Sequence, residues 1–331
     1  MSEDSGVQES SAGSRLRRQA LGGEPDWSTM TAEELAAYRE AENRRRASPE
    51  MRAITGIPDP GAAIGWQELA LPGRRLPVRV YRPTPESGGS SADRAALPLV
   101  LHVHGGGFVG TAVQCDWVNS HLAARLPALV VSVEHRLLAP DTPLSAAADD
   151  GWDALHHLVR HADAWGIDPA RTAVFGESCG ALITALAAIR ARGAGLHLRA
   201  QVLVNPVADL TETMLDHASV TQHAQSPTLT APQLRLFLRL AVPQGTDPRA
   251  LSPLHADNLS GLAPALVVVP THDPLADHGR GYAERLRAAG TPARLTEHLG
   301  APHAFVSMPG VVPQAEAARA EIADFLRGAL T

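Results

Sequence analysis

Five short aliphatic runs constrain the fold of this chain more than any other feature of its sequence. Val, Leu and Ala dominate them, and such nearly continuous apolar runs are typical of strands buried on both faces of a sheet. Segments with helical character lie between the runs, and this alternation predicts a parallel sheet in a doubly wound α/β domain. The runs cover residues 97–103, 128–134, 172–175, 200–204 and 265–269, and the helical segments cover 117–125, 146–161, 180–190 and 277–289.

The N-terminal part of the chain has a different character. Residues 1–25 are polar and rich in Gly and Ser, so we expect a disordered tail there. We expect a helix over residues 31–46, because Thr31 is a suitable N-cap and Glu34, three residues later, can complete a capping box with it. Two short strands are expected after this helix, at 66–71 and 76–81.

One interval interrupts the alternation of strands and helices. Residues of about 209–255 contain a single helix-like stretch and no strand pattern. An insertion at this point lies above the C-terminal edge of the sheet, where open α/β folds bind ligands. We therefore expect a cap built from about 26–55 and about 209–255, within one domain that covers residues 26–331.

Composition excludes several classes of protein. The chain contains no lysine, since all 29 basic residues are arginine, and this excludes P-loop NTPases, protein kinases, pyridoxal-phosphate enzymes and Ser-x-x-Lys hydrolases. The net charge of −6 argues against nucleic acid or an anionic membrane as a partner. Two cysteines, Cys115 and Cys179, imply no disulfide framework. No signal peptide or apolar span of about 18 residues is evident, so we expect a cytoplasmic protein.

A glycine-flanked serine follows the third aliphatic run. Gly176, Ser178 and Gly180 form a G-x-S-x-G pattern between the run at 172–175 and the helical segment at 180–190. Nucleophilic catalysis needs an exposed serine hydroxyl at such a strand-to-helix turn, and glycines on both sides permit the turn without a clash. The alternative is a turn that contains an incidental serine.

A second glycine-rich segment ends the first aliphatic run. His104 is followed by Gly105, Gly106 and Gly107, and glycines let backbone N–H groups approach the oxyanion that forms during acyl transfer. An ordinary Gly-rich turn after a strand is a common alternative. Dinucleotide binding fits less well, because no helix of the required kind opens at these glycines.

An acid and a base follow the serine in the order that this type of sheet requires, Ser, then Asp or Glu, then His. Asp273 follows the aliphatic run at 265–269, and His303 follows a strand-like segment at 293–299. Both positions lie at strand ends, and thus at the sheet edge expected for Ser178. Asp277 is a second candidate acid close to Asp273.

Taken together, these motifs resemble the hormone-sensitive-lipase-like family of α/β-hydrolase esterases, from about residue 66 to the C-terminus. The resemblance rests on HGGGF at 104–108, HRLLAP at 135–140, DPARTAVFGESCG at 168–180, DPLADHGRGYAERLRAAG at 273–290 and PHAF at 302–305. It implies an α/β-hydrolase fold with a mostly parallel eight-stranded sheet, helices on both faces and a helical cap.

The resemblance also implies roles for individual residues. Asp273 rather than Asp277 becomes the partner of His303, and the oxyanion donors become the amides of Gly106, Gly107 and Cys179. The chain departs from the family where His135 replaces a usual tyrosine and where the serine turn reads GESCGA. These departures leave the Ser178, Asp273 and His303 set intact but put the shape of the pocket in doubt.

The function expected is a carboxylesterase-type serine hydrolase that acts on short, acetyl-like acyl esters through an acyl-enzyme. The expected partner is a small-molecule ester, with no cofactor and no metal, and a homodimer is one possible assembly. Two alternatives remain open. A biosynthetic enzyme could use the same site for elimination, cyclisation or acyl transfer, because fold and triad do not determine the reaction, and a ligand-binding receptor could share the fold.

Overall fold

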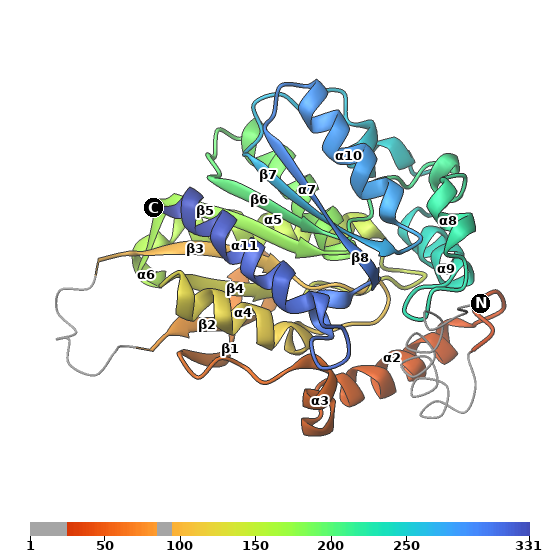
Figure 1. Ribbon diagram of the computed structural model, residues 1–331, viewed down its shortest axis with the longest axis horizontal. Helices are drawn as coiled ribbons and strands as arrows, with labels where there is room; N and C mark the ends of the chain where they lie inside the picture. The colour runs from red at the N-terminus through yellow and green to blue at the C-terminus, as the bar shows by residue number, and fades with distance from the viewer. Residues whose placement is uncertain (1–24, 85–94) are drawn as a thin grey trace, which may run out of the picture.

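The computed structural model describes residues 25–84 and 95–331, and it contains one eight-stranded sheet (Figure 1). The spatial order is β1-β2-β4-β3-β5-β6-β7-β8. β1 pairs antiparallel with β2 and β2 antiparallel with β4, whereas all later pairs are parallel. The predicted mostly parallel sheet is therefore confirmed. The strands are β1 (Ala62–Leu71), β2 (Arg74–Pro83), β3 (Leu97–Val103), β4 (Leu129–Val133), β5 (Ile167–Glu177), β6 (Ala200–Val204), β7 (Ala265–His272) and β8 (Ala293–Pro302).

Helices cover both faces of this sheet because apolar side chains along each central strand point alternately to its two faces. Leu99 and Leu101 of β3 belong to the core shared with α5 and α7, whereas Val100 belongs to the core shared with α4 and α11. α10 packs on the α5–α7 face, against β7. The long helices are α4 (Asp116–Arg125), α5 (Leu144–Arg160), α7 (Cys179–Gly193), α10 (Ala276–Ala288) and α11 (Gln314–Leu330), and α6 (Ala162–Trp165) is a single turn.

The structure extends and completes the elements that the sequence predicted. The strands expected at 66–71 and 76–81 are longer, and Gly73 turns between them at a φ of 74°. Among the residues that extend β1, Ala63 and Gly65 are exposed and Ile64 is partly exposed, so apolar content alone underestimates the length of this strand. α11 was not expected from the sequence. Its Ala-rich surface packs a buried stripe that includes Ala315, Ala318 and Ile322 onto the sheet.

Helical segments gather at one end of the sheet, on the right-hand side of Figure 1. α2 (Ala32–Arg46) begins at the predicted Thr31 cap, which is closed by Glu34. Between β6 and β7 the described chain has no strand. Figure 1 shows α2, α8 (Ala218–Gln222) and α9 (Ala231–Ala241) toward this end, whereas α3 (Arg52–Thr55) lies below the sheet in this view. The same two stretches of the chain also contain the short segments η1 (Pro49–Met51), η4 (Glu212–Leu215), η5 (Pro248–Leu251) and η6 (Pro253–His255).

Two remaining short helices follow glycine-rich or histidine-containing loops, η3 (Ala112–Cys115) and η7 (Phe305–Ser307). The tail predicted for residues 1–25 lies outside the described residues except for its last position. Among residues 25–84 and 95–331, no helix combines the length and apolar character that a membrane crossing requires.

Candidate active site

The turn between β5 and α7 presents Ser178 in a backbone conformation that side chains rarely adopt, with φ 55° and ψ −118°. The amide of Ser178 donates to the carbonyl of Val204 on the adjacent strand over 2.9 Å. Gly176 and Gly180 allow this turn, because a Cβ on Gly176 would meet the Gly180 carbonyl and one on Gly180 would meet the Val103 and His104 carbonyls. The glycines predicted to flank the serine are therefore required by backbone packing.

Three side chains from separate strand ends form a chain of hydrogen bonds. The Nε2 atom of His303 lies 2.8 Å from the Ser178 Oγ atom, and its Nδ1 atom lies 2.8 Å from Asp273 Oδ2. Asp273 is fully buried, and its other oxygen accepts from the amide of Leu275 over 2.9 Å. Such an arrangement lets the imidazole accept the hydroxyl proton while the carboxylate holds the ring.

The second candidate acid has other partners. Asp277 accepts hydrogen bonds from the Ser219 amide over 2.8 Å and from Arg280 over 2.9 Å. These contacts lower the pKa of Asp277 against the opposing effect of its burial, which is the largest single contribution. The geometry brings Asp273, and not Asp277, to His303.

The glycine loop after β3 lies beside the serine turn. Gly106 has a φ of 103°, and a Cβ there would overlap the Val109 carbonyl, so the loop requires glycine at this position. At Gly107 a Cβ would meet the ring of Phe237. Within the described part of the chain, the amides of Gly106, Gly107 and Cys179 donate to no other protein group. Three backbone donors are thus available to a bound oxyanion.

Helix α2 holds the glycine loop through side chains. Arg39 donates to the carbonyl of Phe108 over 2.8 Å and to that of Leu138, and the Asn43 carboxamide accepts from the Gly110 amide over 2.9 Å. One turn later, Arg46 donates to Gln114 over 2.9 Å, and the Gln114 amide donates to the Gly105 carbonyl over 3.2 Å. The loop position therefore depends on a segment far away in the sequence.

Two histidines stack next to the loop. The rings of His104 and His135 lie 4.3 Å apart between centroids. The pKa of both histidines is lowered to about 4. Burial is the main cause for each, and for His135 the neighbouring ring of His104 contributes to the same shift. Both imidazoles are therefore neutral at pH 7. His135, the departure from the family pattern, lies behind the loop and contacts the His104 carbonyl over 3.4 Å.

Several groups near the site were not identified from the sequence. Asn205 follows β6, and its Nδ2 atom lies 3.5 Å from the Nε2 atom of His303. The buried carboxyl of Glu177 accepts from the Ser307 hydroxyl over 2.5 Å, and burial raises the pKa of Glu177. An Asn-Pro pair directly after a buried strand was the only sequence signal for Asn205, and it indicates only a turn.

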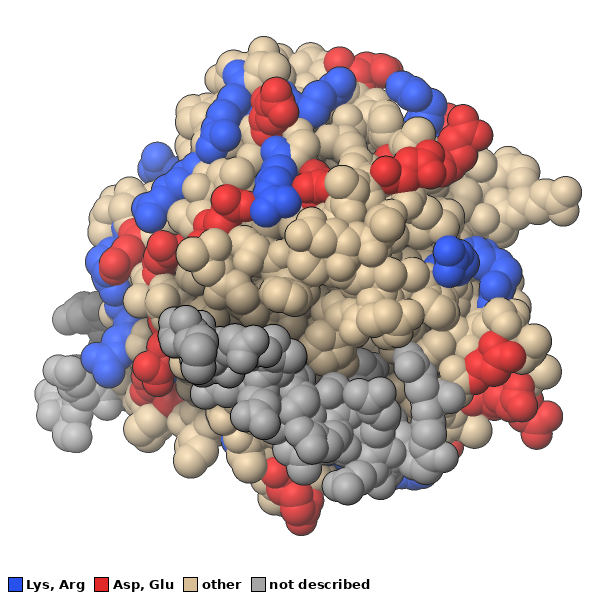
Figure 2. Space-filling model, turned by 45° about the vertical axis from the view of Figure 1, so that its right-hand side comes forward, with Lys and Arg blue, Asp and Glu red and all other residues tan. Residues whose placement is uncertain are grey.

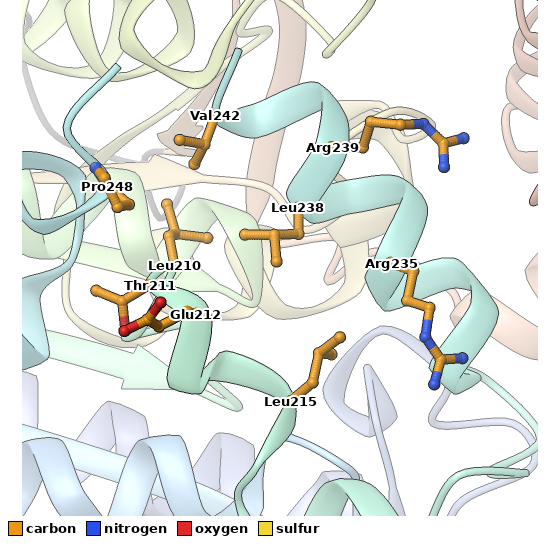
Figure 3. Close-up of a pocket in the computed structure, with 9 residues that line it drawn as sticks. All are labelled: Leu210, Thr211, Glu212, Leu215, Arg235, Leu238, Arg239, Val242 and Pro248. Carbon is orange, nitrogen blue, oxygen red and sulfur yellow. The ribbon is translucent and has the colours of Figure 1, made fainter. Parts of the chain in front are cut away.

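A separate cavity lies in the interval between β6 and β7, with a volume of about 310 Å³. Figure 3 shows its lining side chains, most of them on or next to η4 and α9, and neither Ser178 nor His303 is among them. Figure 2 turns this end of the molecule forward, and uncharged residues form a broad area across the middle of that face. The lining residues are Leu210, Thr211, Glu212, Leu215, Arg235, Leu238, Arg239, Val242 and Pro248.

Comparison with known proteins identifies similar sequences and structures. Residues 100–307 match a family described by the alpha/beta hydrolase fold. Esterase LipI of Mycobacterium tuberculosis is 33% identical over 82% of this chain and 80% of its own length. An ethyl acetate hydrolase of Pseudomonas putida is 36% identical over 84% of this chain and 86% of its own. A solved ester hydrolase from the metagenome of Lake Arreo covers 97% of this chain and 98% of its own, with 30% identity and a TM-score of 0.84.

Proposed function

This chain belongs to the hormone-sensitive-lipase-like carboxylesterases of the alpha/beta hydrolase fold, and we propose that it cleaves short-chain acyl esters with Ser178, His303 and Asp273 as its triad. It is a serine ester hydrolase, as its relatives and structural neighbours are esterases. The observation that carries the triad proposal is the continuous pair of 2.8 Å contacts from Asp273 through His303 to Ser178.

The proposed reaction begins with attack of Ser178 Oγ on the ester carbonyl carbon while His303 Nε2 accepts the hydroxyl proton. Asp273 keeps the Nδ1 proton on the imidazole and stabilises the imidazolium that forms. The tetrahedral intermediate collapses, the C–O bond to the alcohol breaks, and the alcohol leaves with the proton from His303. Water then hydrolyses the acyl-enzyme by the same route.

The backbone amides of Gly106, Gly107 and Cys179 are proposed to bind the oxyanion of this intermediate. Their lack of other partners among the described residues supports this assignment. Fixed donors in a site that excludes water stabilise developing charge more than water does, and each is typically worth about 10²–10³ in rate. Cys179 takes part through its amide alone, because burial raises the pKa of its thiol to about 12 and keeps the sulfur protonated.

A short acyl group is the proposed substrate preference. Phe237 lies in contact with Gly107, and Leu138 lies beside the same glycine, so bulky side chains approach the expected position of the carbonyl. One relative is named for ethyl acetate, an acetyl ester. We propose that residues of about 26–55 and about 209–255 form the cap that limits the pocket, since α2 and α9 supply the contacts around the glycine loop.

Replacement of the nucleophile and of the acid tests the triad. Ser178→Ala should abolish turnover of p-nitrophenyl acetate while the circular dichroism spectrum stays unchanged. Asp273→Asn should lower kcat by about 10⁴-fold, because the imidazole loses the partner that selects its tautomer. Asp277→Asn is the matched control and should retain activity within a few-fold. Full activity in Ser178→Ala would disprove the serine mechanism.

The chain-length preference is tested separately with p-nitrophenyl esters from C2 to C12. We expect kcat/KM to be highest for the shortest esters and to fall as the chain lengthens. Phe237→Ala, which removes the ring next to Gly107, should move the preferred length upward. A maximum at C8 or longer in the wild-type protein would contradict the proposed preference and leave the triad proposal intact.

A further inference from the structure

Asn205 is an unusual residue beside the triad, buried to 1% exposure directly after β6. Its backbone has a φ of 37°, in the left-handed region that Asn tolerates better than most residues. The backbone N–H of Asn205 donates to the Val268 carbonyl over 2.8 Å, and this hydrogen bond fixes the backbone at this position. This backbone conformation ends the strand and places the side-chain carboxamide of Asn205 next to His303.

The carboxamide of Asn205 is only half satisfied. Its Nδ2 atom lies 3.5 Å from His303 Nε2, the atom that also contacts the Ser178 hydroxyl. Its Oδ1 atom is buried and has no hydrogen-bond partner among the described residues. Leaving a buried acceptor without a partner is destabilising, so an unpartnered oxygen next to a reacting nitrogen indicates a partner that arrives during the reaction.

The two halves of the proposed reaction differ in what they place at this nitrogen. In the first half, the Ser178 hydroxyl donates its single proton to His303. In the acyl-enzyme the Ser178 oxygen carries the acyl group and has no proton, so the attacking molecule takes its place at His303 Nε2. Water brings two protons, of which His303 accepts one, and the second needs another acceptor.

We propose that the Oδ1 atom of Asn205 accepts the second proton of the attacking water in a hydrogen bond and so makes water the preferred acyl acceptor. This inference rests on the proposed function of the site. An alcohol of similar size has only one hydroxyl proton, which His303 takes, and it gains nothing from Asn205. The residue thereby favours hydrolysis over acyl transfer, the alternative reaction on the same acyl-enzyme.

The atoms balance in the proposed step. The water oxygen forms a bond to the acyl carbon as one of its protons moves to His303 Nε2. Collapse of the intermediate breaks the bond between that carbon and the Ser178 oxygen, which recovers the proton from His303. The other water proton remains hydrogen-bonded to Asn205 throughout and leaves on the carboxylic acid product.

Competition between water and methanol measures this preference directly. Full-length protein is given p-nitrophenyl butyrate in buffer with a fixed methanol concentration, and the ratio of methyl butyrate to butyrate is measured by gas chromatography. Both products arise from one acyl-enzyme, so the ratio does not depend on how fast the acyl-enzyme forms. A purely structural role of Asn205 would lower the rate and leave the ratio unchanged.

Two variants remove the carboxamide in different ways. Asn205→Ala removes it but keeps a Cβ in the strained conformation, whereas Asn205→Gly removes it and relieves the strain. In both, the ratio of methyl ester to acid should rise about ten-fold, the rate equivalent of one lost hydrogen bond. Gln201→Leu is the matched control, because Gln201 lies on β6, the strand that Asn205 follows, is also buried and also has an unpartnered amide oxygen among the described residues.

A ratio within two-fold of wild type in both Asn205 variants would overturn the proposal, and so would an equal rise in Gln201→Leu. Failure of the underlying function gives a different result. In that case the wild-type protein forms neither product, or Ser178→Ala forms them as well.

Discussion

The serine turn and the glycine loop face the same reacting carbonyl in the proposed mechanism, yet different forces hold them. Ser178 is held by close packing of the backbone, since Gly176 and Gly180 leave no space for a Cβ and the Ser178 amide donates to the Val204 carbonyl. The glycine loop is held by side chains of α2, among which Arg39 contacts positions 69 and 99 residues away. The nucleophile is thus positioned by contacts between backbones, and the glycine loop by side chains of a helix that is distant in the sequence.

The largest effect is expected from breaking the backbone packing of the serine turn. Gly180→Ala places a Cβ against the backbone carbonyls of Val103 and His104, which cannot move away as a flexible side chain could. We expect a loss of about 3 kcal/mol in the free energy of unfolding, measured by urea denaturation. Gly193→Ala, at the end of the same helix with open space around it, is the control and should stay within about 1 kcal/mol of wild type.

Equal stability of the two glycine variants would show that the turn relaxes more easily than its packing indicates. Backbone packing would then not be what positions Ser178.

A change in α2 tests the side-chain contacts that hold the glycine loop. Arg39→Leu removes the two contacts of this arginine, with the carbonyls of Phe108 and Leu138. We expect kcat for p-nitrophenyl acetate to fall about 10–100-fold, because misplaced amides lose part of the stabilisation of the oxyanion. The melting temperature should change by only a few degrees. Arg44→Leu in the same helix removes an exposed pair with Glu40 and should leave kcat unchanged. Wild-type kcat in Arg39→Leu would mean that the remaining contacts position the loop without Arg39.

The smallest effect concerns the pH dependence of the loop side. Because burial lowers the pKa of His104 and His135 to about 4, the unfolded chain binds protons below pH 6.5 that the folded protein does not. Stability is therefore complete above pH 6.5 and falls as the pH drops toward 4. Each histidine should cost about 2 kcal/mol between pH 7 and pH 5.

His135→Tyr removes one of these groups, so its unfolding free energy should fall by about 2 kcal/mol less than that of wild type between pH 7 and pH 5. Urea denaturation at the two pH values measures the difference. His197→Phe replaces an exposed histidine and should follow the wild-type curve. Parallel losses in His135→Tyr and wild type would show that the stacked pair is not a source of acid sensitivity.

The sequence predicted those parts of the molecule that depend on short-range patterns. Buried parallel strands are recognisable because both of their faces are apolar, and the ends of parallel strands lie at one edge of the sheet, so Ser178, His303 and two candidate acids could be proposed from position alone. The choice of Asp273 over Asp277 needed the resemblance to a known family. The contact of Arg39 with the glycine loop could not be predicted, because a helix rich in charged residues can present its arginines to many neighbours. Asn205 was also missed, since its significance lies in an unpartnered oxygen and a distance to His303, and neither is encoded by residue type alone.

The order of the segments along the chain has a consequence for how the protein becomes active. His303 meets Ser178 across 125 positions, and it does so at the end of β8, the last strand to be made. A chain whose synthesis stops before residue 303 therefore has the nucleophile without the base that activates it. Ester turnover thus reports molecules in which β8 is present and paired with β7.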